Sequence, residues 1–395
     1  MLIIGIDATN IRRGGGRTHL IEFLNAADPI RDNFSEVCVW GSKETLQKLP
    51  NHHWLKKKWS PALDGNLIRR TLWQKFSLGR AAKKMNCNVL FVPGGSFNTD
   101  FRPVISMSQN ILPFEWRELR RYGFSLLTLK LILLRLRQSR SFRAADGVVF
   151  LTDYARQGVI NVTGKLSGAT EIIPHGLNPR FLISDYDLTL RKLSKNNAPI
   201  NLIYVSIIDH YKHQWHVVEG VSMARRLSGL DLRLDLVGPS YAPALKRLKF
   251  AISNFDPNNE WINYRGTVDY DELHSLYAKA HIGVFASSCE NMPNILLEMM
   301  GAGLPLLSSD RGPMPDILDN AGLYFDPETP ESLAEVLTEL LSSDKMMQHF
   351  SCAAYKKARD FSWSRCAEST FKFIHQIAGN YSQKGNPPIY NRGDK

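Results

Sequence analysis

The 395-residue chain has few cysteines and no long apolar run. Its cysteines are odd in number and form no Cys-x-x-Cys pair (Cys38, Cys87, Cys289, Cys352 and Cys366). The sequence therefore predicts neither a disulfide framework nor a zinc site, which favours a reducing cytosol. No run of roughly 18 apolar residues occurs, so no segment is expected to span a membrane. The start, Met-Leu-Ile-Ile-Gly-Ile-Asp7, reads as a buried strand and lacks the features of a signal peptide.

Two common nucleotide-binding motifs are also missing. The glycine-rich loop after the first strand is Asp7-Ala-Thr-Asn-Ile-Arg-Arg-Gly14-Gly-Gly16. It fits neither Gly-x-Gly-x-x-Gly nor Gly-x-x-x-x-Gly-Lys-Ser/Thr, which disfavours nicotinamide binding and P-loop hydrolysis. Its glycines permit close approach of a ligand to the backbone, but a flexible turn explains them equally well.

Charge is unevenly distributed along the chain. Residues 1–185 hold 27 Lys and Arg against 14 Asp and Glu, whereas residues 186–395 hold 22 against 24. A basic half followed by a nearly neutral half indicates two domains with different partners.

Both halves alternate short apolar runs with helical segments, as in parallel sheets covered on both faces. The predicted fold class is α/β, with two Rossmann-like doubly wound domains. The predicted boundaries are 1–184, a linker at 185–199, 200–372, and a C-terminal helix with a disordered tail at 373–395 that packs back on the first domain. Expected strands are Leu2–Ile6, Val37–Trp40, Val89–Val92, Val104–Met107, Gly147–Leu151, Glu171–Ile173, Asn201–Val205, Arg233–Val237, Ile282–Phe285, Pro305–Ser308 and Leu323–Phe325.

A pair of glutamates, Glu290 and Glu298, brackets the start of a predicted helix. The helix is apolar on nearly every face, so a carboxylate at Glu298 is costly unless something binds it. Glu290 precedes the first turn, whose free N–H groups favour an anion. The alternative is that both are glutamates favoured by the helix dipole.

Two further candidates lie near predicted strand ends. Lys212 follows a strand of the second half and can direct its ammonium at a phosphate, or it can be an ordinary solvated lysine. His175, between Pro174 and Gly176, is more often structural than catalytic at such a turn.

Residues 116–143 carry eight Arg and Lys against one Glu, interleaved with Leu and Phe at helical spacing. Such a basic amphipathic helix is typical of contact with an anionic membrane surface. A core helix whose arginines reach solvent is equally compatible. Nucleic acid is not expected as a partner, because no nucleic-acid motif accompanies the charge.

Together these segments resemble the retaining glycosyltransferases of the GT-B fold, specifically family 4 (bacterial group 1 type). Glu290-x7-Glu298 followed by Gly301-Ala-Gly-Leu-Pro305 is similar to that family's signature. The order of the other motifs also agrees over nearly the whole chain: the glycine loop, Ile-Pro-His-Gly, Lys212, Val237-Gly-Pro239, Tyr264-Arg-Gly-Thr-Val268 and Phe361-Ser-Trp363.

The resemblance implies roles for individual residues. Glu298 would bind the ribose hydroxyls of a nucleotide-sugar donor, Glu290 the hydroxyls of its sugar, and Lys212 the leaving diphosphate. The other implied donor contacts are backbone contacts, from Gly15, Gly16, Met292, Pro293, Asn294, Ile295, Gly266, Thr267 and Val268. No metal and no cofactor are expected.

The chain departs from the family's pattern at two places. An arginine usual before the lysine is replaced by Ser206-Ile-Ile208, and Arg17 or Arg311 is expected to supply the missing phosphate contact. A histidine usual after the fourth strand is replaced by Ser108-Gln-Asn110. Gln109, Asn110 and His175 are therefore candidate sugar contacts, although an amide cannot titrate near neutral pH.

The sequence thus predicts a retaining, metal-independent glycosyltransferase of the cytoplasm, peripheral at the inner face of the plasma membrane. The donor is expected to be a GDP-, UDP- or dTDP-sugar, with mannose favoured, and the acceptor a glycan, most simply lipid-linked. Lipopolysaccharide, O-antigen or exopolysaccharide synthesis is the expected setting. The alternatives are a nucleotide-sugar epimerase of the same fold and a non-catalytic protein that binds sugar nucleotides or nucleic acid.

Overall fold

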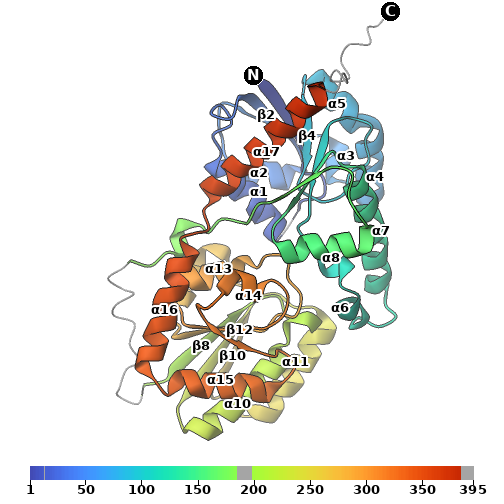
Figure 1. Ribbon diagram of the computed structural model, residues 1–395. Coiled ribbons are helices and arrows are strands. Elements are labelled where there is room, and N and C mark those ends of the chain that lie inside the picture. The colour runs from blue at the N-terminus through green and yellow to red at the C-terminus, as the bar shows by residue number, and fades with distance from the viewer. Residues whose placement is uncertain (13, 185–197, 384–395) are drawn as a thin grey trace, which may run out of the picture. The chain divides into compact units, whose positions relative to one another are not determined.

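The computed structural model describes residues 1–12, 14–184 and 198–383 (Figure 1). The chain divides into two compact units, which are described separately. Unit 1 comprises Met1–Glu115, Phe124–Gly176 and Ser362–Lys395, and unit 2 comprises Trp116–Gly123 and Leu177–Phe361.

Unit 1 is built on a parallel sheet in the order β3-β2-β1-β4-β5-β6-β7. Its strands are β1 (Leu2–Asp7), β2 (Phe34–Trp40), β3 (Leu55–Lys58), β4 (Val89–Val92), β5 (Val104–Met107), β6 (Gly147–Phe150) and β7 (Ala169–Ile172). Its helices are α1 (Gly15–Ala26), α2 (Lys43–Lys48), α3 (Pro61–Asp64), α4 (Leu67–Trp73), the π-helix η1 (Gln74–Leu78), α5 (Gly79–Lys84), the short 3-10 helix η2 (Leu112–Phe114), α7 (Leu126–Ala144), α8 (Asp153–Thr163) and α17 (Trp363–Gln383).

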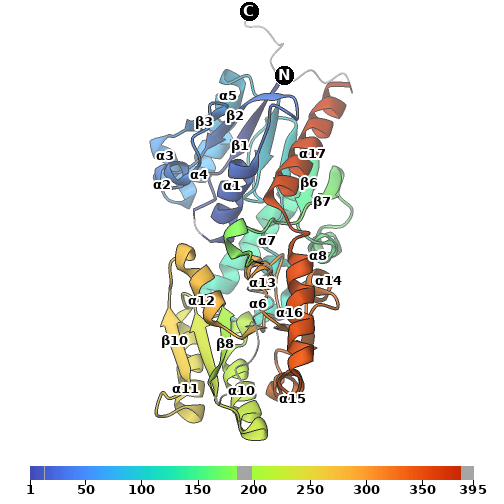
Figure 2. The ribbon, with the colours of Figure 1, turned by 90° about the vertical axis from the view of Figure 1, so that its left-hand side faces the viewer.

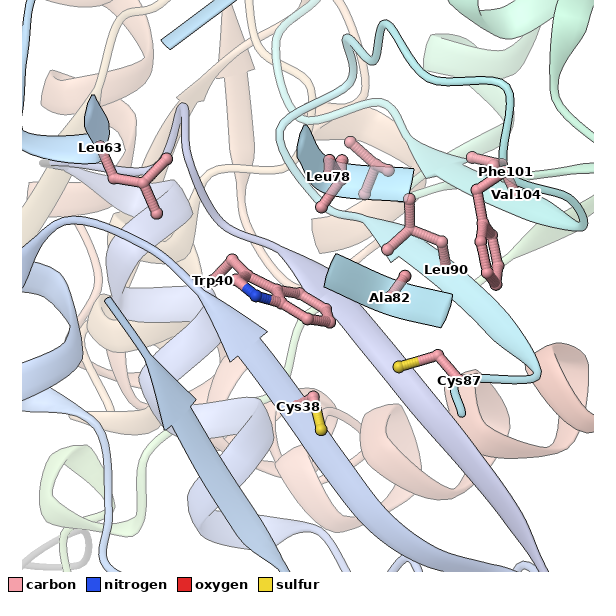
Figure 3. Close-up of a cluster of buried hydrophobic side chains, with 10 residues drawn as sticks. Cys38, Trp40, Leu63, Leu78, Ala82, Cys87, Leu90, Phe101 and Val104 are labelled. Atoms are coloured by element: carbon pink, nitrogen blue, oxygen red, sulfur yellow. The ribbon is translucent and has the colours of Figure 1, made fainter. Parts of the chain in front are cut away.

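One core of unit 1 surrounds the indole of Trp40 (Figure 3). Cys38, Leu78, Cys87 and Leu90 pack around it and are fully buried. A glycine is needed on the intervening strand, because a Cβ at Gly5 would lie 2.9 Å from the Trp40 ring. On the other face α17 lies beside α1 (Figure 2), with Phe371 stacked on Phe23 at 5.3 Å between ring centroids.

Unit 2 has a parallel sheet in the order β10-β9-β8-β11-β12-β13. Its strands are β8 (Ile200–Val205), β9 (Leu232–Val237), β10 (Ile262–Gly266), β11 (Ile282–Phe285), β12 (Leu306–Ser309) and β13 (Leu323–Phe325). Its helices are α6 (Trp116–Arg120), α10 (Gln214–Ser228), α11 (Ala242–Phe255), α12 (Leu273–Lys279), α13 (Asn294–Gly301), α14 (Met314–Leu318), α15 (Pro330–Leu341) and α16 (Asp344–Ala358), with 3-10 turns η3 (Pro179–Phe181), η4 (His210–Lys212) and η5 (Tyr270–Glu272).

Two doubly wound parallel sheets confirm the predicted fold class. All the expected strands are present, within a few residues of their predicted ends. Two strands were not predicted, β3 and β10, and both lie at sheet edges. Their sequences, Leu-Lys-Lys-Lys and Ile-Asn-Tyr-Arg-Gly, carry polar residues because an edge strand need not be covered on both faces.

The unit boundaries differ from the predicted ones. Trp116–Gly123 belongs to unit 2 although it lies within the predicted first domain, and unit 2 resumes at Leu177 rather than at 200. The C-terminal helix begins at Trp363 instead of 373, and it belongs to unit 1 from Ser362 onward. Most of the predicted linker (185–197) and of the predicted tail (384–395) lies outside the described residues.

The basic segment 116–143 is not one continuous helix, which corrects the expectation of a single amphipathic element. It forms α6 in unit 2 and α7 in unit 1. The break falls at Gly123, whose φ of 56° is left-handed. Ser125 then caps α7 by accepting a hydrogen bond of 3.2 Å from the Thr128 amide.

Candidate functional site

The order of the strands locates a candidate site in unit 2. From β8 the chain proceeds to β9 and β10 on one side, and from β11 to β12 and β13 on the other. The strand order therefore reverses between β8 and β11. Ligands of doubly wound sheets bind beyond the carboxyl ends of the strands at such a reversal.

Lys212 follows β8 and Glu290 follows β11, and their side chains form an ion pair at this reversal. Only 6% of Lys212 is exposed. Its Nζ also lies 5.1 Å from the centroid of the Tyr211 ring and 5.2 Å from that of Phe285. The ammonium is thus held with one carboxylate and two aromatic faces, where a positive charge is screened far less than in water.

Backbone hydrogen bonds bring the two loops together. Asp209 caps η4 by accepting from the His210 amide at 2.7 Å. The Ser288 amide donates to the Tyr211 carbonyl at 2.8 Å, which joins the loop after β11 to the loop after β8. The Tyr204 hydroxyl donates to the Lys212 carbonyl at 2.8 Å. Hydrogen bonds to the backbone of both loops therefore hold Lys212 and Glu290 in position to form their ion pair.

Helix α6 and the residues that follow it add a second support, which sequence analysis missed. The Tyr122 hydroxyl donates to Asp209 Oδ1 at 2.9 Å, and Ser288 Oγ donates to Glu118 Oε2 at 2.9 Å. Arg121 is paired with Glu118 at 2.7 Å. Segment 116–123 therefore contacts both loops of the site. No sequence pattern links residues so far apart in the chain.

Glu298 lies on α13, and only 2% of it is exposed. The hydroxyl of Tyr277 on α12 donates a hydrogen bond of 3.0 Å to Glu298 Oε2. Burial raises the pKa of Tyr277 well above its usual range, and the neighbouring Glu298 raises it further. A protein donor thus satisfies one oxygen of the carboxylate that the sequence singled out.

The start of α13 carries the other predicted donor contacts of this loop. Pro293 is the N-cap residue and makes no side-chain cap. Among the described residues, Oδ1 of Asn294 is buried without a hydrogen-bond partner. Met292 is buried and Ile295 is half-buried. An uncapped helix start beside Glu290 keeps backbone donors for an anion.

The carboxyl ends of β9 and β10 are shaped by two glycines. A Cβ at Gly238 would lie 2.1 Å from the Ser206 carbonyl oxygen, so a side chain cannot be accommodated there. The Gly238 amide donates to the Gly266 carbonyl at 2.7 Å, and Gly266 has a left-handed φ of 68°. Thr267 follows Gly266 and is exposed, and Val268 is half-buried.

The two arginines expected to supply an extra phosphate contact both have carboxylate partners. Arg311 pairs with Asp326 at 2.7 Å and with Asp310 at 3.0 Å. Arg17 pairs with Glu44 at 2.7 Å and donates to the Arg12 carbonyl at 2.9 Å. Their charge is therefore partly neutralised within their own units.

In unit 1 the structure brings Gly16 and Gln109 together. A Cβ at Gly16 would lie 2.7 Å from Gln109 Oε1, so the glycine permits this approach. Gly15 is exposed at the start of α1. Asn110 accepts from the Leu112 amide at 3.1 Å, which forms a local turn. Gly15 and Gly16 thus share one region of unit 1 with the two amides expected to contact sugar.

His175 is buried against a second histidine. Its Nδ1 lies 2.9 Å from Nδ1 of His19, and both rings contact Trp363. Burial lowers the pKa of His19 to about 3. Burial also lowers the pKa of His175 well below its usual range, and His19 lowers it further. A neutral, buried pair of histidines fits a structural rather than a catalytic role for His175.

Outside the site of Lys212 and Glu290, the described residues hold a groove but no cluster of metal ligands. No group of three or more His, Cys, Asp and Glu side chains is placed to hold a metal ion in this part of the chain. A groove of about 650 Å³ lies against β9 and β10, away from Lys212 and Glu290. Two of its charged residues, Asp235 and Arg265, pair with each other at 2.9 Å.

Comparison with known proteins gave a family match for most of unit 2. Residues 185–357 match the family model described as "Glycosyl transferases group 1". O-antigen chain mannosyltransferase B of Escherichia coli is 22% identical over 242 residues, which cover 58% of this chain and 60% of that protein. The chain thus spans less than two thirds of that relative.

Solved structures share the fold. Sucrose-phosphate synthase from Thermosynechococcus elongatus superposes with a TM-score of 0.74 at 15% identity, covering 96% of this chain and all (100%) of that one. Anabaena Alr3699/HepE in complex with UDP-glucose gives a TM-score of 0.67 at 15% identity, covering 97% and 100%.

Proposed function

We propose that the chain is a retaining, metal-independent glycosyltransferase of family 4, starting from the match of residues 185–357 to the family model described as "Glycosyl transferases group 1". The observation that carries the proposal is the ion pair of Lys212 and Glu290 at the reversal of strand order in that domain. The pair places a buried cation beside a carboxylate, which suits a donor that carries a diphosphate and a hydroxyl-rich sugar.

In the proposed reaction the bond between the anomeric carbon of the sugar and the diphosphate oxygen breaks. An acceptor hydroxyl forms the new bond on the same face, and a donor phosphate oxygen takes its proton. Lys212 exchanges its contact with Glu290 for the diphosphate, whose negative charge grows as it leaves. Glu290 is then free to accept hydrogen bonds from the sugar, and Glu298 accepts from the ribose.

We assign mannose as the transferred sugar, with GDP-mannose as the donor and a lipid-linked glycan as the acceptor. Support comes from the relative whose name is O-antigen chain mannosyltransferase B. The HepE complex with UDP-glucose supports a nucleotide sugar as donor in this fold. The proposed setting is synthesis of a cell-surface polysaccharide.

A peripheral membrane contact is part of the proposal. In unit 1, α7 exposes a stripe of leucines at helical spacing (Leu126, Leu129, Leu133 and Leu136), and α4 with η1 exposes Leu67, Ile68, Leu72 and Phe76. Helices α4 and α7 are neighbours (Figure 1), joined by a hydrogen bond of 3.3 Å from Arg137 to Thr71. Exposed Arg69, Lys75, Lys130 and Arg140 lie on the same two helical segments. Apolar rows flanked by cations suit an anionic lipid surface. None of the described helices is long and apolar enough to cross a bilayer.

The experiment that tests the activity has two stages. First, the melting temperature is measured with GDP, UDP and dTDP, because a ligand that binds only the folded protein raises it. The matching nucleotide sugar is then used in a transfer assay with Glu298→Ala and with Glu339→Ala, a matched change at an exposed position of α15. Glu298→Ala should abolish transfer, whereas Glu339→Ala should not. Full transfer by folded Glu298→Ala contradicts the assignment of the donor site.

A further inference from the structure

Three arginines of unit 1 have no carboxylate partner among the described residues. Arg12 lies in the loop after β1, Arg70 on α4 and Arg137 on α7, and each is half-buried. None takes part in an ion pair in that part of the chain. Three cations in one unit, without an ion pair among the described residues, suit an anionic ligand.

Neutral groups hold the three side chains in place. Arg70 Nη1 donates to the Thr9 carbonyl at 3.0 Å and to Asn10 Oδ1 at 3.2 Å. Arg12 donates to the Leu63 carbonyl, and Arg137 Nη2 donates to Thr71 Oγ1 at 3.3 Å. The Nε atoms of Arg12 and Arg70 are buried, and no acceptor within the described residues reaches them. Each guanidinium thus keeps donors that an anion could use.

The cations are close enough to repel one another. Burial lowers the pKa of Arg70, and the charges of Arg12 and Arg137 lower it further. Two carboxylates of this region, Asp7 and Asp64, accept hydrogen bonds from other residues. Buried Asp7 accepts from Gln74 Nε2 at 2.6 Å and from the Thr9 amide at 3.0 Å. Asp64 is near enough to Arg12 for their charges to interact, although the two form no ion pair. It is exposed, and it accepts from the Lys43 amide at 2.9 Å and from Trp59 Nε1 at 2.6 Å.

The cluster formed by Arg12, Arg70 and Arg137 lies where the sheet of unit 1 is expected to bind a ligand. The strand order of unit 1 reverses between β1 and β4, and Arg12 and Asn10 follow the carboxyl end of β1. The loop after β4 is close by, because a Cβ at Gly94 would lie 3.4 Å from the Asn10 Cβ. This is the crevice that doubly wound sheets use for binding. The exposed apolar rows of α4 and α7 belong to the same helices as Arg70 and Arg137.

We propose that Arg12, Arg70 and Arg137 bind a phosphate or diphosphate group of the acceptor. A guanidinium matches phosphate oxygens with two parallel hydrogen bonds, and three of them can surround a diphosphate. The apolar rows beside the cluster fit a chain attached to that phosphate. The acceptor class is then a glycan joined to lipid through a phosphate ester. This inference rests on the proposed function.

The test uses the full chain, saturated with its nucleoside diphosphate so that the donor site is blocked. Two probes are compared: inorganic pyrophosphate by calorimetry, and phosphatidylcholine vesicles with or without phosphatidic acid by flotation. The variants are Arg12→Gln, Arg70→Gln and Arg137→Gln. Matched controls are Arg31→Gln, which follows α1, and Lys84→Gln on α5, both exposed in the same unit and outside the proposed membrane contact.

Each cluster variant should weaken pyrophosphate binding about tenfold, whereas each control should change it less than about twofold. Strong binding of phosphatidic-acid vesicles with weak binding of free pyrophosphate assigns the site to a lipid phosphate. Strong binding of free pyrophosphate with weak binding of the vesicles assigns it to a soluble phosphate. Equal losses in cluster and control variants, or no binding of either probe, overturn the inference. If the protein transfers sugar normally but binds neither pyrophosphate nor phosphatidic-acid vesicles in preference to plain vesicles, only this inference is refuted. If it binds no nucleoside diphosphate and transfers no sugar, the proposed function is refuted.

Discussion

The Tyr277 hydroxyl lies 3.0 Å from Oε2 of Glu298, and both side chains are buried in unit 2. If Glu298 binds the ribose of the donor, the two residues should differ in what their loss affects. Tyr277→Phe removes one donor from a buried carboxylate, which should lower the free energy of unfolding by about 1–3 kcal/mol. Glu298→Gln keeps the volume but weakens hydrogen bonds from ribose hydroxyls, and should raise the KM for the donor about tenfold.

The measurements are chemical denaturation and initial rates against donor concentration. Leu337→Ala, a change on the buried face of α15 in the same unit, controls for a general loss of stability. A stability loss in Tyr277→Phe with an unchanged KM supports the division of roles. If Glu298→Gln leaves the KM unchanged, Glu298 is a structural acceptor for Tyr277.

The ion pair of Lys212 and Glu290 gives a second prediction. Their side chains are only 8% and 15% exposed, so removing one partner should cost about 3–5 kcal/mol of unfolding free energy. The double change Lys212→Met with Glu290→Gln removes both charges and should recover most of that stability. Activity should not return, because the cation that stabilises the leaving diphosphate is still absent, at a cost of about 10²–10³ in kcat.

A double-mutant cycle of stability and of kcat checks this directly. Recovery of stability without recovery of rate separates the chemical role of Lys212 from its packing. Recovery of both stability and rate in the double variant, or a normal kcat in the single variant Lys212→Met, is incompatible with a role for Lys212 in departure of the diphosphate.

Sequence patterns predicted the strands that are buried on both faces, such as Val89–Val92 and Ile282–Phe285. A short continuous apolar run is typical of a parallel strand that is covered on both faces. Sequence patterns also placed Lys212 at the end of a strand and Glu290 ahead of a helix. The fold then brings these residues together, because β8 and β11 are adjacent although they are far apart in the chain.

Contacts made by single polar side chains could not be predicted in this way. Tyr122 and Asp209 are joined by one hydrogen bond, although they lie in segments far apart in the chain. The assignment of 116–123 to unit 2 depends on such contacts, so the predicted domain boundary missed it. The unpaired state of Arg70 likewise depends on which carboxylates the fold brings near.

The buried histidine pair predicts sensitivity to acid. The pKa of His19 falls from 6.5 to about 3 on burial, and that of His175 is also lowered. Below about pH 6.5 the unfolded chain takes up protons that the folded protein does not, so acidification favours unfolding. Each such histidine should cost about 1.4 kcal/mol per pH unit between roughly pH 6 and 4.

Denaturation measured across this pH range, with wild type and His19→Asn, tests the linkage. Asparagine cannot titrate but can still bond to His175, so the slope of unfolding free energy against pH should fall by about one proton. His274→Asn changes an exposed histidine on α12 and serves as the control. An unchanged slope in His19→Asn shows that this pair does not couple protonation to folding.

The last prediction concerns the surface of α7. Leu129 and Leu133 are both about half exposed, at 54% and 52%, and lie one turn apart. Replacing both with glutamate adds two negative charges and removes apolar contact, so flotation with vesicles containing phosphatidylserine should fall about tenfold or more. Raised salt should weaken binding of the wild type, since the attraction to the charged surface is screened. The control pair is Glu335→Gln with Glu339→Gln on α15, which should float as the wild type does. If the double glutamate variant floats normally while its donor binding is intact, α7 is not the membrane contact, and the acceptor must reach the enzyme by another surface.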